Sequence, residues 1–202
     1  MNDSFRSRGM FFLRNGDASL IMEKNDIANY SVVERLRDGR LVTIRSIRPD
    51  DKGRVTDALL KVSSESLYRR TFSAKRVLGD DELEQLTGVD FKNIVALVAV
   101  MSDEAQDRIV GGGRYIRAGA SPKAEVAFLI DDAHQGLGIG SRIFKHLVAI
   151  ARASGIVQFE AEVLPSNEGM LRVFTRSGLP VARTTLRDSV HVTIELNASH
   201  AP

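Results

Sequence analysis

The sequence contains no cysteine among its 202 residues. The chain therefore cannot form a disulfide framework, a zinc or iron–sulfur site with cysteine ligands, or a covalent intermediate on a thiolate. Apolar runs stay far below the roughly 18 residues that cross a bilayer. A large excess of one charge is also missing, because 28 Lys and Arg face 26 Asp and Glu. The net charge of +2 gives no sign of nucleic-acid binding. We predict no membrane or nucleic-acid partner and a cytoplasmic location.

Metal-binding spacing is missing as well. The four histidines show neither H-x-x-x-H nor H-E-x-x-H spacing, so we predict no metal site. The remaining composition, 43% hydrophobic and 27% charged, is typical of a globular protein. The length fits one large domain or one domain with an appendage.

The chain divides into three predicted parts. Residues 1–38 show no sustained periodicity, and we predict an N-terminal extension that is partly disordered. The alternative is a segment that packs on the domain or on a partner. Residues 39–197 are predicted to form one domain, and residues 198–202 a short tail.

The hydrophobic pattern after residue 39 predicts an α/β (α+β) domain with a mostly antiparallel sheet of about seven strands and one βαβ crossover. Strands are predicted at 41–47, 94–101, 108–116, 124–130, 156–164, 181–186 and 189–196. Helices are predicted to begin near Pro49, Ser64, Asp80, Ser141 and Asn167. Three consecutive glycines at 111–113, inside a strand pattern, predict a bulge or a close backbone approach.

A glycine-rich loop at residues 135–141 follows the strand at 124–130 and opens a helix. Backbone N–H groups and the helix N-terminus together favour a phosphate or pyrophosphate at such a place. A P-loop is excluded because no Lys follows these glycines, and Ser141 and Ile143 stand where a dinucleotide fingerprint needs its last glycine. The pattern that fits is Q-x-x-G-x-G.

That pattern resembles the pyrophosphate loop of the GNAT superfamily of acetyl-CoA-dependent N-acetyltransferases. The resemblance covers about residues 40–196. Segments 64–73, 82–90, 124–128 and 167–171 are similar to the acetyltransferase domain of bacterial protein lysine acetyltransferases. The resemblance implies a GNAT fold in which the fourth and fifth predicted strands splay apart. It also implies direct acetyl transfer from acetyl-CoA to a primary amine, with a protein lysine as first candidate and a small-molecule amine as runner-up. Whether the chain forms a homodimer stays open.

The resemblance also implies roles for individual residues. Glu125 holds the position of the catalytic glutamate, which would take a proton from the amine. Glu160 and Glu162 share one face of the next strand, and Glu162 is the reserve base. The residues implied in coenzyme A binding are Leu129, Ile130, Gln135, Gly136, Leu137, Gly138, Ile139, Gly140, Ser141, Asn167 and Phe174.

Phe174 departs from the family pattern. Many members carry there a Tyr that protonates the leaving thiolate, and Phe has no proton to give. A catalytically weak acyl-CoA-binding sensor or partner subunit is therefore the alternative of another class, and a dinucleotide-binding protein is the third option.

Overall fold

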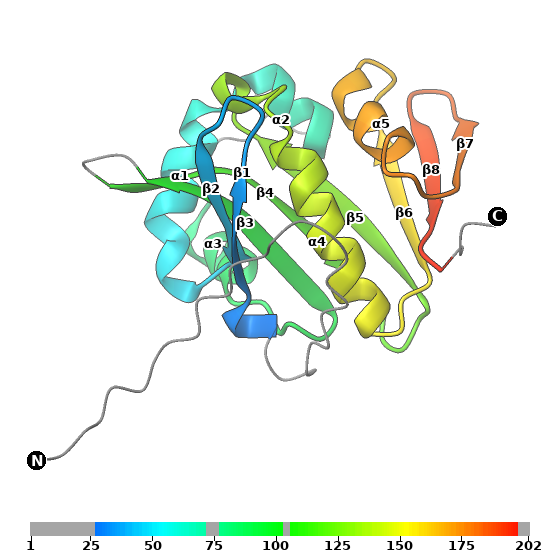
Figure 1. The fold of residues 1–202 in the computed structure, drawn as a ribbon, viewed down its shortest axis with the longest axis horizontal. Helices are drawn as coiled ribbons and strands as arrows, with labels where there is room; N and C mark the ends of the chain where they lie inside the picture. Colours follow the sequence, from blue (N-terminus) through cyan, green and yellow to red (C-terminus); the bar gives the residue numbers. More distant parts are fainter. Residues whose placement is uncertain (1–26, 72–76, 103–105, 198–202) are drawn as a thin grey trace, which may run out of the picture.

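Residues 27–71, 77–102 and 106–197 are described by the computed structural model of the chain. They form one sheet of eight strands with helices on both faces (Figure 1). The spatial order is β1-β2-β3-β4-β5-β6-β8-β7. All neighbours are antiparallel except β5 and β6, which are parallel. The α+β fold class predicted from the sequence is confirmed.

The strands are β1 Ser31–Arg35, β2 Leu41–Ser46, β3 Ile94–Ser102, β4 Asp107–Ile116, β5 Lys123–Ile130, β6 Gln158–Val163, β7 Val181–Thr185 and β8 Val190–Glu195. The α-helices are α1 Lys52–Lys61, α2 Ser64–Thr71, α3 Asp80–Thr87, α4 Ile139–Ala153 and α5 Glu168–Thr175. Three short 3-10 helices are η1 Ile27–Asn29, η2 Pro49–Asp51 and η3 Asp132–His134.

Strand β1 is the eighth strand, and it lies within the segment predicted as an extension. It pairs with β2 from Ser31, opposite Arg45, to Arg35, opposite Leu41. The Ser46 hydroxyl also donates to the Ile27 carbonyl at 2.5 Å, which holds η1 against β2. Five residues without clear alternation carry too weak a pattern to predict a strand. Residues 1–26 of the predicted extension and the predicted tail at 198–202 lie outside the described residues.

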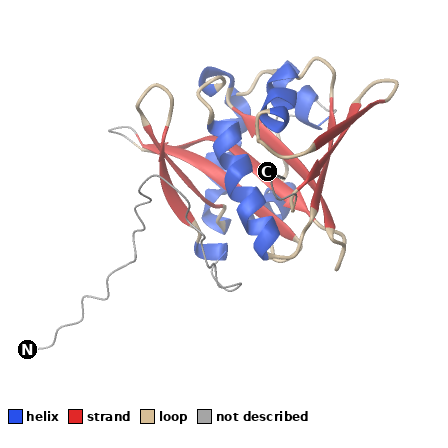
Figure 2. Cartoon of the chain, turned by 45° about the vertical axis from the view of Figure 1, so that its right-hand side comes forward, coloured by secondary structure: helices blue, strands red, loops and turns tan. Residues whose placement is uncertain are grey.

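Helix α4 covers one face of the sheet, and α1 and α3 lie on the other (Figures 1 and 2). The apolar residues of α4 recur at helical spacing, which gives the helix one buried stripe. Phe144 of this stripe packs against Phe128 of β5 and Phe174 of α5, with ring centroids 5.9 and 5.3 Å apart. This aromatic cluster forms the centre of the larger core and joins α4, α5 and the sheet.

Both predictions for the three glycines are confirmed. The β3–β4 register shifts between Ala99 and Val100, which marks a bulge in front of the glycines. A Cβ placed on Gly113 would lie 2.4 Å from Cδ1 of Phe128 and 2.8 Å from Cγ2 of Ile143. Only glycine allows these two side chains to pack directly on the β4 backbone.

The parallel strands β5 and β6 pair over a short stretch and then separate. Their register runs from Lys123, opposite Gln158, to Glu125, opposite Glu160. Both strands continue beyond these pairs, to Ile130 and Val163. The sheet is therefore split at the place where the splay is predicted, and the β5 backbone at 126–130 has no strand partner on its β6 side.

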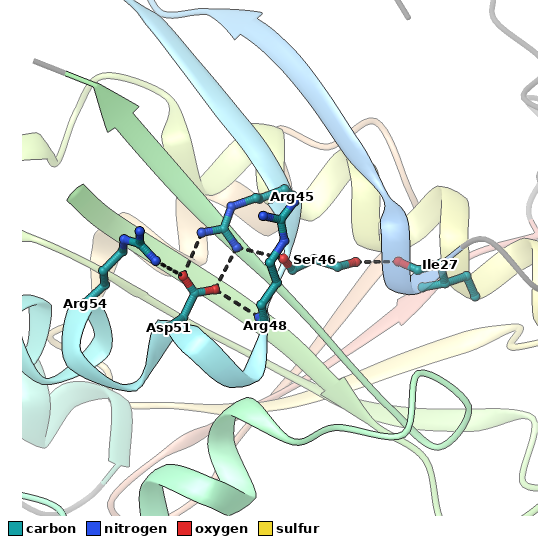
Figure 3. Close-up of polar contacts among 6 residues, drawn as sticks. All are labelled: Ile27, Arg45, Ser46, Arg48, Asp51 and Arg54. Atoms are coloured by element: carbon teal, nitrogen blue, oxygen red, sulfur yellow. Dashed lines mark hydrogen bonds and ion pairs between the residues drawn. The ribbon is translucent and has the colours of Figure 1, made fainter. Parts of the chain in front are cut away.

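A buried ion-pair cluster joins α1 to β2 (Figure 3). Asp51 is fully buried and accepts two hydrogen bonds of 2.7 Å from the Arg45 guanidinium. Its carboxylate also accepts from the backbone N–H of Arg48 at 2.9 Å and from Arg54 at 3.1 Å. The cluster fixes the start of α1, which is one wall of the cavity described below.

Candidate active site

A groove runs along the open edge of β5 toward the N-terminus of α4. Arg37 and Ser66 line the groove together with residues in or next to β5, the glycine-rich loop, α4 and α5. These residues are Phe128, Leu129, Ile130, His134, Gln135, Gly136, Gly138, Ile139, Gly140, Ser141, Asn167, Gly169, Met170, Arg172, Val173 and Arg176. None of these described residues is acidic, whereas three are arginines. The charge of the groove favours an anionic ligand.

The loop presents its backbone to the groove because two of its glycines adopt left-handed conformations. Gly136 has φ +78° and Gly138 has φ +87°. Gly138 is also the N-cap of α4, a helix of 15 residues, so the loop leads directly into that helix N-terminus. Other residue types rarely adopt such φ values without strain. The loop backbone and the positive end of the α4 dipole therefore border the same space.

Asp132 holds this loop in place. Its carboxylate accepts a hydrogen bond from the Gln135 amide at 2.9 Å. It also accepts from the Ser63 backbone at 2.8 Å and from the Ser66 hydroxyl at 2.5 Å. Gln135, predicted as a cofactor-binding residue, thus connects the loop to α2 through one acidic side chain.

The face of the sheet opposite α4 carries three glutamates, Glu125, Glu160 and Glu162. We call this face the acidic face. Glu125 and Glu160 are direct neighbours in the parallel pairing of β5 and β6. Glu160 accepts from Lys123 at 3.1 Å. No hydrogen bond or ion pair to Glu125 occurs among the described residues. Its carboxylate is exposed and is the free one of the three.

Glu162, the predicted reserve base, is occupied by neighbours. It accepts from His191 Nδ1 at 2.6 Å and from the Ser189 hydroxyl at 2.7 Å. Partial burial alone would raise the pKa of Glu162, but these hydrogen bonds and the nearby His191 lower it below the ordinary value. A lowered pKa makes Glu162 a weaker base than an ordinary carboxylate.

A second cavity of about 400 Å³, the front cavity, lies on this face between the sheet and helices α1, α2 and α3. Its lining is mostly apolar, with Val55, Leu59 and Leu67 among the helical residues. Leu129 lines both the groove and the front cavity, so the two spaces meet at β5. Arg114 also lines the front cavity and forms no ion pair within the described chain. Burial lowers the pKa of Arg114, and the charge of nearby Glu125 partly opposes this effect.

A model of the acetyltransferase (GNAT) family matches residues 64–179, which is more than half of the chain. The chain belongs to the acetyltransferase (GNAT) family. It is 34% identical over 153 residues to the acetyltransferase Pat of Mycolicibacterium smegmatis, and the match covers 75% of this chain. A Pseudomonas aeruginosa acetyltransferase is 30% identical over 138 residues, covering 68% of this chain and 74% of that protein.

Solved structures of GNAT proteins agree with this assignment. The GNAT domain of S. lividans PAT superposes with a TM-score of 0.75 at 35% identity, covering 83% of this chain and 98% of that one. A cAMP-binding acyltransferase from Mycobacterium smegmatis superposes with a TM-score of 0.58 at 26% identity, over 84% of this chain and 48% of that protein. Only 45% of the M. smegmatis Pat length is matched. The chain thus spans less than half of that relative.

Two predicted cofactor residues of this GNAT chain have clear packing functions. Asn167 is the N-cap of α5, and its side chain accepts from the Met170 backbone at 3.2 Å. It also lines the groove, so capping and ligand contact are compatible. Phe174 is fully buried in the aromatic core and does not line the groove. It borders only a small cavity in the split between β5 and β6.

Three residues of the GNAT site escape sequence reasoning. Arg37 reaches the groove from the turn between β1 and β2, inside the segment predicted as an extension. Arg114 lies in the predicted strand at 108–116, and Asp132 lies between the predicted strand at 124–130 and the loop at 135–141, but neither belongs to a motif. Their positions follow from the sheet register and from the packing of α2 on the loop, which a linear pattern does not contain.

Two findings concern residues 27–71, 77–102 and 106–197 as a whole. No group of three or more His, Asp or Glu side chains close enough to hold a metal ion occurs there. None of the helices described is both long and apolar enough to cross a membrane.

Proposed function

We propose that this GNAT chain is an acetyl-CoA-dependent N-acetyltransferase that transfers acetyl directly to a primary amine, with a protein lysine as the favoured acceptor. One observation carries the proposal. The groove has no acidic residue in its described lining and is bounded by unpaired β5 backbone and a glycine-rich helix N-terminus. At Leu129 it meets the apolar front cavity, which lies on the face that carries Glu125. A donor and an acceptor can thus approach the same strand from two sides.

The groove residues fit an acyl-CoA donor. The amides of residues 135–141 and the α4 N-terminus suit its pyrophosphate, because they offer donors and a positive dipole end without a competing carboxylate. The β5 backbone near Leu129 and Ile130, which β6 leaves unpaired, suits the amide groups of the pantetheine arm. The donor supplies an activated acetyl group as a thioester. A Salmonella typhimurium GNAT-fold protein whose structure includes acetyl-CoA superposes with a TM-score of 0.60 at 19% identity.

Glu125 is the proposed general base. A lysine amine has an ordinary pKa of about 10.4, so at pH 7.5 only roughly one molecule in 800 is neutral and nucleophilic. A carboxylate can remove the proton directly or through a water. Glu125 forms no hydrogen bond or ion pair with a described residue, unlike Glu160 and Glu162, and Arg114 acts on it only through its nearby charge. Leu129 lies four residues after Glu125 on the strand, a distance of about 13 Å, which leaves room for the amine and a relay water.

The front cavity and the acidic face together suit a lysine acceptor. A lysine side chain has an apolar stem of four methylenes and a cationic end. Apolar walls such as Val55 and Leu59 would contact the stem, and the glutamates would attract the ammonium. The relatives described as Pat support a protein acceptor. A small-molecule amine is the alternative acceptor. The proposed domain comprises residues 39–197 together with strand β1, which pairs with β2 in the same sheet.

The buried Phe174 favours a second candidate, an acyl-CoA-binding sensor or partner subunit with weak catalysis. Its ring is fully enclosed by the core, so no side-chain acid is available at this position. A thiolate of coenzyme A leaves readily, which makes the enzyme proposal compatible with this residue. Measured acetyl transfer distinguishes the enzyme from the acyl-CoA-binding sensor or partner subunit.

The test measures thiol release from acetyl-CoA together with mass spectrometry of a lysine-containing protein acceptor. Wild type should acetylate the acceptor, and Glu125→Gln should lower kcat by about 10²-fold or more. The control is Glu195→Gln, an exposed glutamate at the end of β8, which should retain wild-type turnover. If wild type binds acetyl-CoA but acetylates neither proteins nor small amines, the sensor candidate replaces the enzyme. If Glu125→Gln matches wild type, Glu125 is not the base.

A further inference from the structure

The turn between β1 and β2 lies against the back of the glycine-rich loop. The Arg37 backbone N–H donates to the Leu137 carbonyl at 3.5 Å, and Nη1 of Arg37 donates to the Gly136 carbonyl at 3.3 Å. From the helix side, Arg142 donates to the Gly138 carbonyl at 3.2 Å and contacts the Arg35 carbonyl. These contacts hold the Arg37 guanidinium at the rim of the groove.

The charge of Arg37 is not neutralised. It is exposed, and no carboxylate lies within ion-pair distance of it in the described parts of the chain. Neighbouring arginines differ, because Arg40 pairs with Asp38 at 2.6 Å and Arg142 lies 3.4 Å from Glu34. Its one side-chain contact uses one of five guanidinium donors and involves a neutral carbonyl. Arg37 therefore has donors and charge available for an anion.

Arg37 lies on the carbonyl side of the loop, whereas a pyrophosphate is expected on its amide side. Coenzyme A carries a further phosphate on its ribose, and this group continues past the pyrophosphate, away from the thioester. The rim of the groove offers two arginines that form no ion pair with any described residue, Arg37 and Arg176. Arg176 follows the C-terminal end of α5, where the helix dipole disfavours an anion. Arg37 lies beside the N-terminus of α4, where the dipole adds to its own charge.

We infer that Arg37 binds the 3′-phosphate of the donor's ribose, and that the β1–β2 hairpin is part of the donor site. The inference rests on the proposed function, since it takes the donor to be a coenzyme A thioester. It assigns a ligand contact to a segment that precedes the residues matched by the family model, 64–179.

The test compares binding of coenzyme A and dephospho-coenzyme A by calorimetry on the full chain. Wild type should bind coenzyme A about tenfold more tightly than dephospho-coenzyme A, as expected for one charge-assisted contact in an exposed position. Arg37→Gln should lose about tenfold in coenzyme A affinity and keep its dephospho-coenzyme A affinity within about twofold, so discrimination disappears. Arg40→Gln, on the same turn but paired with Asp38 and outside the groove, is the matched control and should discriminate like wild type.

Arg176→Gln tests the alternative that Arg176 binds the 3′-phosphate. This variant should still bind coenzyme A more tightly than dephospho-coenzyme A. If the discrimination disappears in Arg176→Gln and persists in Arg37→Gln, the inference is wrong. An equal loss of both ligands in Arg37→Gln would also overturn it, because Arg37 would then act on the loop or the pyrophosphate. A folded wild type that binds neither ligand would refute the proposed function as well. The melting temperature of Arg37→Gln without ligand should equal that of wild type, because the side chain is exposed.

Discussion

Asp51→Asn should destabilise the fold far more than a typical surface substitution. The Asp51 carboxylate is fully buried and receives four hydrogen bonds, two of them from Arg45 (Figure 3). Asparagine has nearly the same shape but no charge. The Arg45 side chain, of which only 10% is exposed, would then be left without its anion.

The magnitude follows from burial. Removing one partner of a buried ion pair costs about 3–5 kcal/mol, whereas an exposed pair contributes about 0–1 kcal/mol. Arg54 is 40% exposed, so solvent screens its contribution and Arg45 dominates. With a urea m-value of about 2 kcal/mol/M, a loss of about 4 kcal/mol lowers the unfolding midpoint by about 2 M. That is a large part of the roughly 5–15 kcal/mol that stabilises a typical domain.

The assay is equilibrium urea unfolding of wild type, Asp51→Asn and a neighbouring control. The control is Glu84→Gln, which removes the exposed pair with Lys52 and should cost less than about 1 kcal/mol. A loss below about 1 kcal/mol in Asp51→Asn would refute the argument that burial sets the strength of this cluster.

The same cluster predicts a pH dependence. Burial alone would raise the pKa of Asp51, but Arg45 and the other donors lower it below the ordinary value. The stabilisation is therefore present above about pH 4 and is lost as the pH falls through the lowered value. Asp51→Asn should lose less stability than wild type over that acid range. Equal acid slopes in both proteins would contradict this sign.

Three further predictions concern the core, the loop and a buried histidine. Gly113→Ala places a methyl 2.4 Å from Phe128, so its melting temperature should fall by several degrees, corresponding to about 1–3 kcal/mol; an unchanged value would show that β4 yields freely. Gly138→Ala strains a backbone with φ +87° at the loop, which should lower the free energy of unfolding by about 1–2 kcal/mol. Calorimetry should show weaker coenzyme A binding by this variant, and wild-type affinity would contradict the role of this conformation. Burial lowers the pKa of His146 despite the opposing effect of Glu34, so stability should be complete above about pH 6.5 and decrease below it. His146→Gln should flatten that slope in unfolding measurements, and an unchanged slope would assign it to other groups.

Much of the fold could be predicted from local patterns. The alternation in strands and the helical spacing in α4 reflect which residues face the core, and the structure confirms the α+β sheet, its split and the bulge at the glycines. Strand β1 was missed because its stability comes from pairing with β2 and not from its own five residues. The roles assigned to Glu125 and to the loop residues stay predictions, although the groove brings most of the proposed donor residues together.

The sequence by itself predicted a phosphate-binding loop, because glycine spacing and a helix start are local properties of the backbone at residues 135–141. It also excluded any reaction on a cysteine side chain of the protein, since there is no cysteine. Only the tertiary structure decided which glutamate lacks a hydrogen-bond partner among the described residues and which arginines line the groove. Hydrogen bonding distinguishes Glu125 from Glu162, and the partners of Glu162 are Ser189, just before β8, and His191 in β8, 27 and 29 residues away. The position of Arg37 depends on a turn that contacts a loop 99 residues later in the chain. Such long-range contacts arise from packing and strand register, which no short stretch of sequence contains.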